Sequence, residues 1–341
     1  MPRSQCRRRL VLLSAVLVLL LLPVTGALAQ ARHKLTQAGF RVLYMAPAFI
    51  ALEKGFFTQE NVDFTFTELD SGALGAAAVI SGNAEISDLD PLGVARLQQE
   101  GKPLLLFYNL VGRVTLDLIV RTPVAQRLGL TGDTPLAARY AALKGLTIGI
   151  TRPGAPTDVF ARYFLVRAGL NPDRDATLVQ VGGVPALAAA FKSERIDAFL
   201  LSPPLPQTLE REGAGRIVIR NTAGDVPELK DTTYAAMFTT AEYARRNGAA
   251  LQAYARALRR ATEWLQTNKP EGLRILGEKY FKETPAASLA ISLDATLPAI
   301  SADGRFSQTG IQRYLDIFKT VGETVSASAA EGVLWTNEFV R

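Results

Sequence analysis

The sequence has 341 residues and a formal net charge of +6, from 38 Lys and Arg against 32 Asp and Glu. Residues 1–29 hold four of the arginines and no acid, so the remaining 312 residues carry only +2, too little for a strongly basic nucleic-acid-binding protein. The only Cys, Cys6, lies in that first segment, and the only His, His33, follows it closely. These counts exclude a disulfide and a thiolate nucleophile from the remainder, disfavour His-based catalysis or metal binding, and predict no cofactor.

Residues 1–29 have the pattern of a secretory signal peptide. Arg7–Arg9 precede a 13-residue, largely apolar run at 10–22, which is too short for a membrane-spanning helix of about 20 residues. A proline and a glycine end the run, and the small residues of 27–29 form a cleavage pattern before Gln30. The arginines also allow a twin-arginine signal, but the general secretory route fits their flanking residues better. We therefore expect a soluble, largely monomeric protein in the periplasm.

After residue 30, short apolar segments alternate with amphipathic segments, which is typical of α/β proteins with mainly parallel sheets. The first series has predicted strands at 40–45, 62–68, 84–87 and 104–108 and predicted helices at 48–54, 73–81 and 91–100. A crossover strand is predicted at 115–121. The second series has predicted strands at 146–150, 177–181, 198–201 and 217–220 and predicted helices at 157–168 and 185–192. From residue 241 onward the pattern is mostly helical, with an apolar stripe at helical spacing over 251–265.

The two series resemble each other internally. With an offset of 112, residues 71–92 align with residues 183–204, and six of the 22 positions are identical. Both segments contain a helix, a polar turn with an acid (Glu85 or Asp197), an apolar strand and a loop with proline. Two similar lobes that face each other would form a cleft, and parallel sheets place ligands at the carboxyl ends of their strands.

Five short motifs carry a family resemblance. They are Ala46-Pro47 with Glu53–Phe57, then Ser81–Ile86, Leu143–Gly149, Ala168–Pro172 and Ile196–Ala198. In this order they resemble the solute-binding proteins of nitrate/sulfonate/taurine-type ABC importers, within a superfamily that includes pyrimidine-precursor binders. The resemblance covers about residues 40–204 well and the helical tail loosely.

The resemblance implies a type II periplasmic-binding fold. Two α/β lobes, each a mainly parallel sheet flanked by helices, would be joined by two crossover strands that act as a hinge. The first lobe is expected at 30–118, the second at 119–222, and residues 223–341 return to the first lobe and add the C-terminal helices. One small ligand would lie in the cleft, and an ABC permease and ATPase would be the partners.

The loop 151–157 is the most informative part of the expected ligand site. Pro156 suits a first helical position, and Ala155 before it has no side-chain oxygen to cap the free N–H groups. An anion bound there would gain about 0.3 to 2 kcal/mol from the helix dipole in addition to its hydrogen bonds. The alternative is an ordinary helix end capped by water. Arg152 adds a positive charge beside this helix start.

Arg113, Asp90 and Tyr44 have two interpretations each. Arg113 could hold a carboxylate or sulfonate in a bidentate contact, or be solvated or paired with Asp117. Asp90 before Pro91 fits a helix cap; near a ligand it would repel an anion or recognise an amine. Tyr44 could wall an apolar ligand body or belong to the core. The predicted ligand-binding residues are Tyr44, Pro47, Ser71, Gly72, Asp90, Arg113, Arg152, Gly154, Ala155, Thr157, Gly183 and Ser202, and no catalytic or metal-binding residue is predicted.

We therefore predict an extracytoplasmic solute-binding protein that captures a small organic anion, a sulfonate or carboxylate, and delivers it to an ABC importer. Three alternatives stay open on the same fold. One is a secreted enzyme, although enzymes of this superfamily rely on Cys or His in the cleft. Another is a binder of a neutral pyrimidine precursor. The third is an accessory protein that binds the same ligand but contacts a sensor kinase.

Overall fold

The computed structural model of the protein describes residues 32–69 and 72–340. The predicted signal peptide, residues 1–29, and the predicted site residue Ser71 lie outside this part of the chain. Residues His33–Arg341 form one compact unit that contains two five-stranded sheets. Within the described ranges, no helix combines the length and the apolar character needed to cross a membrane.

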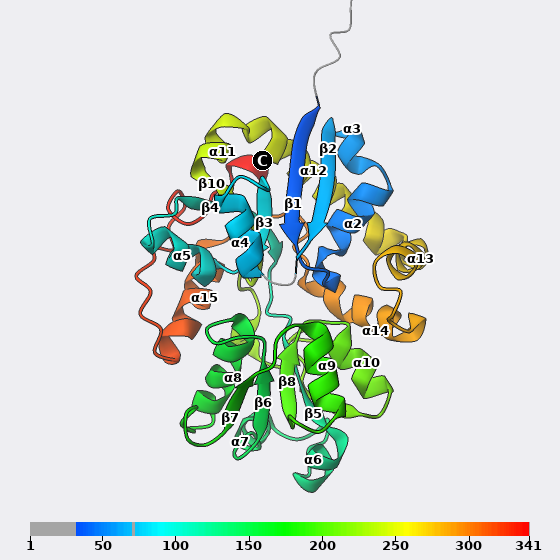
Figure 1. Ribbon diagram of the computed structural model, residues 1–341, viewed down its shortest axis with the longest axis vertical. Coiled ribbons are helices and arrows are strands. Elements are labelled where there is room, and N and C mark those ends of the chain that lie inside the picture. The colour runs from blue at the N-terminus through cyan, green and yellow to red at the C-terminus, as the bar shows by residue number, and fades with distance from the viewer. Residues whose placement is uncertain (1–31, 70–71, 341) are drawn as a thin grey trace, which may run out of the picture. The chain divides into compact units, whose positions relative to one another are not determined.

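Sheet A has the strand order β2-β1-β3-β10-β4 (Figure 1). β1 pairs in parallel with β2 and β3, whereas β10 is antiparallel to both β3 and β4. Four strands therefore run in one direction, and their carboxyl ends meet at one edge of the sheet. The strands are β1 (His33–Gly39), β2 (Val62–Glu68), β3 (Ile86–Leu89), β4 (Leu104–Val111) and β10 (Ala235–Thr240).

Sheet B repeats this plan with the order β7-β6-β8-β5-β9. β6 is parallel to β7 and β8, and β5 is antiparallel to β8 and β9. The chain passes from sheet A to sheet B at 112–116, the first crossing, and returns at 220–234, the second crossing. In each sheet the reversed strand is the one that follows a crossing. The strands are β5 (Asp117–Arg121), β6 (Thr147–Ile150), β7 (Thr177–Gln180), β8 (Ala198–Leu201) and β9 (Gly215–Ile219).

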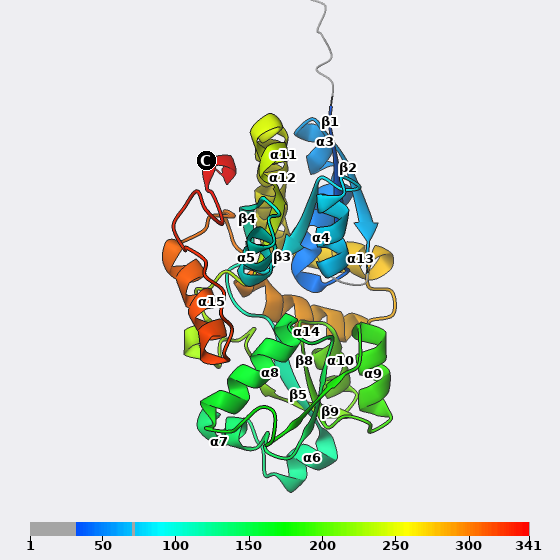
Figure 2. The ribbon, with the colours of Figure 1, turned by 60° about the vertical axis from the view of Figure 1, so that its left-hand side comes forward.

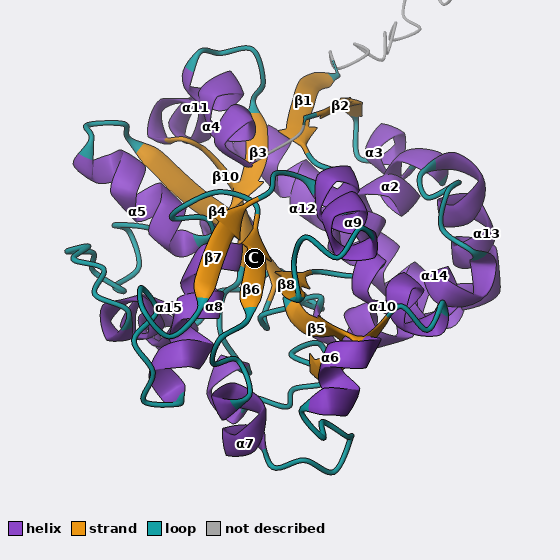
Figure 3. Ribbon diagram, turned by 60° about the horizontal axis from the view of Figure 1, so that its bottom comes forward, coloured by secondary structure: helices purple, strands orange, loops and turns teal. Residues whose placement is uncertain are grey.

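Helices flank both sheets (Figures 2 and 3). Those of the sheet A half are α2 (Ala46–Glu53), α3 (Phe56–Gln59), α4 (Gly72–Ile80), α5 (Pro91–Gln99), α11 (Ala241–Arg246), α12 (Gly248–Thr267), α13 (Lys269–Lys279), α14 (Ala286–Thr296) and α15 (Gln308–Thr320). Those of the sheet B half are α6 (Thr122–Arg127), α7 (Leu136–Ala141), α8 (Pro156–Arg167), α9 (Val184–Lys192) and α10 (Leu205–Arg211). Short 3-10 turns are η2 (Leu43–Met45), η3 (Pro227–Leu229), η4 (Leu297–Ala299) and η5 (Glu338–Val340). Helices of the two halves are in contact, because α14 packs on α10 and α15 packs on α8.

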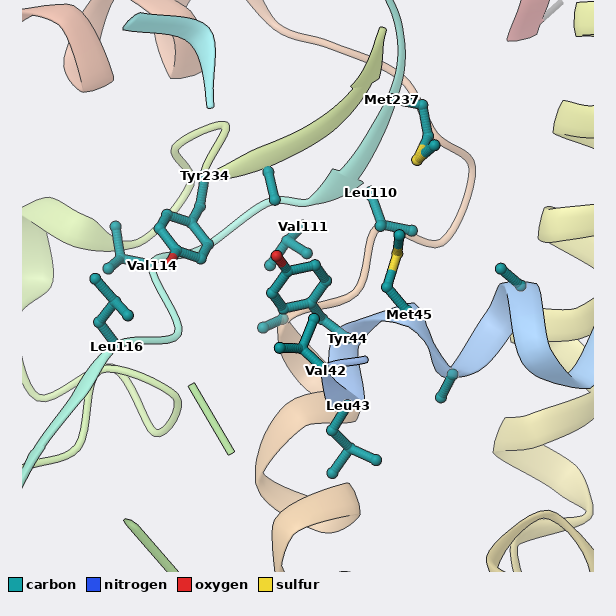
Figure 4. Packing of buried hydrophobic residues seen from close by; sticks show 14 of the residues in the cluster. Val42, Leu43, Tyr44, Met45, Leu110, Val111, Val114, Leu116, Tyr234 and Met237 are labelled. Atoms are coloured by element: carbon teal, nitrogen blue, oxygen red, sulfur yellow. The ribbon is translucent and has the colours of Figure 1, made fainter. Parts of the chain in front are cut away.

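One hydrophobic core runs from sheet A into sheet B. It includes Phe107 in sheet A, Tyr234 in the second crossing, and Leu118 and Phe160 in the sheet B half. Figure 4 shows Tyr44 beside Val111 and Tyr234 over Val114, so that both rings border the first crossing. A second core lies under α4, α5 and α15, and a third lies under α9 and α10. We call the region between the carboxyl ends of the two sheets the junction. Because the shared core runs through it, the junction is also part of the hydrophobic interior.

The predicted strand at 40–45 is wrong. The strand is His33–Gly39 instead, because this segment pairs with both β2 and β3, and Leu43–Met45 forms the turn η2. Residues 43–45 are apolar because they cover the carboxyl end of sheet A, where Tyr44 packs edge-on against Tyr234. β10 is absent from the predicted strands, because its partners β3 and β4 lie far earlier in the chain.

The internal repeat appears in the element bounds. Adding 112 to the bounds of α4 and β3 gives 184–192 and 198–201, which are the bounds of α9 and β8. The acids before the two strands have the same role: Glu85 accepts a hydrogen bond from the Thr36 amide at 2.5 Å, and Asp197 accepts one from the Thr147 amide at 3.0 Å. Each acid therefore ties its central strand, β3 or β8, to the neighbouring parallel strand, β1 or β6.

Candidate functional site

The candidate site lies where the carboxyl ends of the two sheets meet. On the sheet A side, η2 follows β1 and Asp90 follows β3. On the sheet B side, the loop 151–155 follows β6 and Ser202 follows β8. In α/β sheets this edge is where ligands bind, because the loops there leave the strands next to one another.

Tyr44 and Asp88 form the buried base of the sheet A side. The Tyr44 hydroxyl donates to Asp88 Oδ2 at 3.1 Å, whereas Asp88 Oδ1 has no hydrogen-bond partner among the described residues. Burial raises the pKa of Asp88 to about 7, although the hydrogen bond from Tyr44 opposes the shift. Burial and the nearby Asp88 carboxyl raise the pKa of Tyr44 well above its usual value, so this phenol stays protonated. Because Asp88 was not among the predicted residues, it is an addition from the structure.

Asp90 caps helix α5 and faces the same junction. Its Oδ1 accepts the Gly93 amide at 3.0 Å, as the helix-cap interpretation expects. Burial raises the pKa of Asp90, while this cap and the positive charge of Arg96 oppose the shift. Asp90 is also close enough to Tyr314 of α15 to raise the pKa of that phenol, together with burial. The residue therefore both caps a helix and brings a carboxylate to the junction.

Tyr234, Ser202 and Thr115 connect the two crossings with sheet B. The hydroxyl oxygens of Ser202 and Thr115 are 2.7 Å apart. Burial raises the pKa of Tyr234, and a hydrogen bond with Ser202 opposes this shift. The Tyr234 ring lies 6.4 Å from the rings of both Tyr44 and Phe160, in edge-on contacts. An aromatic row thus runs from η2 across the junction to α8.

The loop 151–157 makes more internal bonds than the sequence suggests. Ala155 caps α8 without a side-chain hydrogen bond, as expected. Thr157 Oγ1 accepts the Thr151 amide at 3.0 Å, and the Gly154 amide donates to Asp158 Oδ2 at 2.8 Å. A carboxylate of the protein therefore already lies at this helix start and reduces its attraction for an external anion.

Two arginines at the junction bind carbonyl groups of the protein. Arg96 of α5 donates to the Gly154 carbonyl at 3.0 Å, which links the sheet A and sheet B halves, and also pairs with Glu323 at 2.6 Å. Arg113 donates to the Thr222 carbonyl at 2.9 Å, and its buried Nε has no partner among the described residues. Arg152 is exposed. Of the predicted cations, Arg152 is the one that faces solvent.

Asp117, the proposed alternative partner of Arg113, binds other groups. It accepts hydrogen bonds from the Thr222 amide at 3.0 Å and from Gln207 Nε2 at 2.7 Å. Burial raises the pKa of Asp117 to about 7, against the effect of these hydrogen bonds. Arg113 and Asp117 thus hold the carbonyl and the amide of the same residue, Thr222, where the two crossings lie side by side.

The remaining predicted residues lie at helix starts. Pro47 is buried in the first turn of α2, Gly72 begins α4, and Gly183 precedes α9 and is exposed. Two of the predicted residues, Asp90 and Ser202, occupy equivalent positions of the repeat, since 90 + 112 = 202. Tyr234, Arg96 and Phe160 were not predicted, because only tertiary contacts bring them to this junction.

Two hollows lie away from the junction, on the sheet A half. One of about 440 Å³ is bordered by α4 and β2, and one of about 660 Å³ by α11, α12 and the C-terminal segment. Their linings lack the convergent acids and phenols of the junction, so we place the candidate site at the junction. The described part of the chain contains no group of three or more His, Cys, Asp or Glu side chains arranged to hold a metal ion.

Each of the two sheets contains one antiparallel strand, β10 or β5, that the chain adds after crossing from the other sheet. The sheets are flanked by helices and meet at their carboxyl edges. This is the fold of periplasmic binding proteins. A protein from Bordetella bronchiseptica RB50 has this fold with a TM-score of 0.75 and 24% identity, over 91% of this chain and 96% of that one. The alkanesulfonate-binding protein SsuA from Xanthomonas axonopodis has it with a TM-score of 0.68 and 18% identity, over 86% and 94% of the two chains. The predicted fold class is confirmed.

The chain belongs to the NMT1-like family, which matches residues 30–276. It is 27% identical to the nitrate/nitrite binding protein NrtA of Nostoc over 265 residues, 72% of this chain and 57% of that protein. It is 23% identical to the bicarbonate-binding protein CmpA of Synechococcus elongatus over 301 residues, 83% of this chain and 65% of that protein. The match thus spans less than two thirds of these two relatives. The predicted resemblance to ABC-importer solute-binding proteins is confirmed.

Proposed function

We propose that this protein is the solute-binding protein of an ABC importer and has no catalytic activity of its own. The observation that carries the proposal is the convergence of Asp90 and Ser202 with Tyr44 and Tyr234 at the carboxyl edges of both sheets. Membership of the NMT1-like family and the binding proteins among its relatives support the same function. One small solute would be held between the two halves and handed to a permease that an ATPase drives.

The solute that we propose is a small organic anion, a sulfonate or carboxylate. Its support is the exposed Arg152 at the end of β6 and the unpaired Nε of Arg113. Relatives named for nitrate, bicarbonate and sulfonate binding support an anionic solute. A neutral pyrimidine-like solute is the rival, because it could pack against Tyr44 and Tyr234 and needs no cation.

We also propose that the protein acts in the periplasm as a soluble monomer after removal of residues 1–29. Sequencing the N-terminus of the periplasmic protein should give Gln30 or a residue close to it. Recovery of intact Met1 in the membrane fraction would contradict this.

Native mass spectrometry of the purified protein should detect a co-purified small molecule. Calorimetric titration against sulfonates, carboxylates, nitrate, bicarbonate and pyrimidines should then find a solute with a dissociation constant on the order of micromolar. Arg113→Ala should weaken binding of an anion about 10- to 150-fold, the value of one charge-assisted hydrogen bond, and leave a neutral solute unaffected. Turnover of any solute during the titration would instead favour an enzyme.

A further inference from the structure

We propose that Asp88 and Tyr44 form a proton switch, through which the binding of an anionic solute at the junction takes up one proton from water. Asp88 accepts this proton, and the Tyr44 hydroxyl then donates to the solute. Asp88 is thus a positioning residue, because it acts on the solute through Tyr44. The inference rests on the proposed function and adds a coupling between solute binding and pH.

The hydrogen bond between Tyr44 and Asp88 can run in either direction. An ionised carboxylate can only accept, so the Tyr44 hydroxyl then donates to Asp88 Oδ2 at 3.1 Å. In that state the phenol oxygen offers a solute only lone pairs, which an anion cannot use. When Asp88 carries a proton, its carboxyl hydroxyl can donate to the phenol oxygen, and the Tyr44 hydroxyl is released to donate to an anion. The protonation state of Asp88 therefore decides whether Tyr44 can bind an anion.

The surroundings of Asp88 do little to hold it in the ionised form. It is 2% exposed, and its Oδ1 has no hydrogen-bond partner among the described residues. A Cβ atom at Gly39 would lie 3.1 Å from this Oδ1 and 3.5 Å from Met45 Cε and Phe66 Cε2, so apolar atoms surround this side of the carboxyl. Burial raises the pKa of Asp88 to about 7, so the carboxyl exchanges its proton near neutral pH.

Three phenols face Asp88, and none of them titrates near neutral pH. They are Tyr44 from η2, Tyr234 from the second crossing and Tyr254 from α12. Burial raises the pKa of all three phenols, and the Asp88 carboxyl contributes to each shift. These hydroxyls therefore stay protonated when Asp88 gains or loses its proton.

The charge on the sheet A side favours proton uptake with an anion. Asp90, two residues beyond Asp88, is the second carboxyl of this side, and the Gly93 amide and Arg96 favour its ionised form. Arg96 is already bound to a carbonyl and a carboxylate of the protein. An anion beside two ionised carboxylates would be repelled, and burying an uncompensated charge is costly. A proton taken up by Asp88 cancels the charge that the anion brings.

The switch fixes the sign of a pH dependence. A bound anion favours the protonated carboxyl, so the pKa of Asp88 is higher in the complex than in the solute-free protein. The dissociation constant should therefore rise about 5- to 10-fold between pH 6, where the solute-free carboxyl is mostly protonated, and pH 8, where it is mostly ionised. Proton uptake should be about 0.5 to 1 per bound anion at pH 8 and about 0.1 at pH 6.

The test counts these protons directly. The probe is the tightest-binding anion among the sulfonates, carboxylates and nitrate of the calorimetric panel, chosen so that its own charge is constant from pH 6 to 8. Protein and probe are mixed at matched pH in unbuffered potassium chloride, because common buffers are themselves sulfonates or phosphates. Back-titration with acid gives the uptake. Calorimetry in imidazole and Tris buffers gives the dissociation constant at pH 6, 7 and 8.

Two variants separate the partners of the switch. Asp88→Asn keeps a permanent donor beside the phenol oxygen, so it should take up no proton at pH 8 and bind the probe about as tightly as the wild type does at pH 6. Tyr44→Phe keeps the ring and removes the donor, so it should weaken binding about 10-fold or more at pH 6 and abolish the uptake. The matched control is Asp117→Asn, the same change at a buried acid whose pKa is also raised to about 7. It should keep the uptake.

No uptake by the wild type at pH 8, uptake that persists in Asp88→Asn or Tyr44→Phe, or a dissociation constant that does not rise with pH overturns the inference. So does uptake that is lost in Asp90→Asn or Asp117→Asn but kept in Asp88→Asn. If Asp88→Asn fails to fold by circular dichroism, the wild type and Tyr44→Phe decide.

The proposed function and the switch fail on different results. Binding of a neutral solute and of no anion overturns the switch and leaves the solute-binding function standing. The proposed function fails when no co-purified molecule is found and no solute of any class binds.

Discussion

The two halves of the molecule share a backbone plan and differ in chemistry where their central strands end. β3 and β8 lie 112 residues apart in the sequence, and an acid, Glu85 or Asp197, ties each to its neighbouring parallel strand, β1 or β6. At the carboxyl ends of these strands, sheet A has Asp88 and Asp90, whereas sheet B has Leu200 and Ser202 at the equivalent positions. The comparison shows that strand pairing and these two acids hold the same backbone arrangement in both halves. The last residues of each central strand and the first residues of the following loop can therefore differ. We expect these residues to determine which groups of the solute each half contacts.

The largest effect is expected from removing the ring that joins the halves. Phe160 is fully buried and has ring contacts with Tyr234 at 6.4 Å and with Tyr314 at 6.2 Å. Phe160→Ala should lower the free energy of unfolding by about 3 to 5 kcal/mol, as for other buried Phe residues, and also weaken solute binding. Urea denaturation and calorimetry measure the two effects.

Phe191→Ala is the matched control, because Phe191 is equally buried but packs on Phe199 within the separate core of sheet B. It should cost similar stability and leave solute affinity unchanged. Equal solute affinity of the wild type and folded Phe160→Ala would show that the shared core does not shape the site.

Exchanging the equivalent residues tests the chemical difference directly. Asp90→Ser should change stability by less than about 0.5 kcal/mol, because Ser caps a helix about as well as Asp, and it should strengthen binding of an anionic solute, because it removes a carboxylate from the junction. Ser202→Asp should weaken binding of every anionic solute about 10-fold, because it adds a carboxylate beside Tyr234 at the junction. Titration of both single variants and of the double exchange measures these effects. Unchanged affinity in both single variants would mean that the two positions do not contact the solute.

Two buried acids, Asp88 of β3 and Asp117 at the start of β5, make the stability of the protein depend on pH. Asp88 and Asp117 have pKa values raised to about 7 from an ordinary value of 3.8. Between these values the folded protein binds more protons than the unfolded chain, so these two acids make the free energy of unfolding fall as the pH rises from about 4 to about 7, after which their contribution is level. Denaturation curves across this range measure the slope.

Replacing each acid by its amide should give opposite results at pH 8. Asp88→Asn should raise stability by about 1 kcal/mol, because it removes a buried charge that accepts one hydrogen bond. Asp117→Asn should lower stability by about 1 kcal/mol, because the amide group meets the donors of Thr222 and Gln207. A shared sign for the two variants would contradict this account of the hydrogen bonds.

The smallest effect is expected for the bond that Arg96 makes between the halves. Arg96→Met should change the free energy of unfolding by only about 0.5 kcal/mol, because the arginine is partly exposed and its charges are screened. It removes the hydrogen bond to the Gly154 carbonyl, so the halves should separate more easily without solute. Small-angle scattering should then show a larger radius of gyration for solute-free Arg96→Met than for solute-free wild type, and similar radii at saturation. Arg162→Met, which removes ion pairs within the sheet B half, should leave the radius unchanged.

Local patterns in the sequence determined where many of the strands and helices of the two sheets lie. The strands 62–68 and 198–201 were predicted with their observed bounds, and the five predicted helices lie within two residues of the bounds of α2, α4, α5, α8 and α9. Capping residues and prolines mark these starts, and the apolar periodicity within each segment depends on neighbours close in the chain. Asp90 and Ser202 could be selected from such local patterns, since Asp90 directly precedes the predicted helix 91–100 and Ser202 directly follows the predicted strand 198–201. Asp88 could have been selected too, because strand alternation places it on the same face as Asp90.

Only the tertiary structure decided which residues meet. Leu43–Met45 is as apolar as a strand, but contacts with the second crossing make it a cover over the end of sheet A. Tyr234 reaches Tyr44 across 190 positions of sequence, and Arg96 reaches the Gly154 carbonyl across 58, distances at which no periodicity operates. The same contacts show that one terminal nitrogen of Arg113 and the start of α8 already have partners in the protein, whereas the Nε of Arg113 has none among the described residues. Residue types in a sequence state which groups can donate or accept, but only the fold shows which of them remain free for a solute.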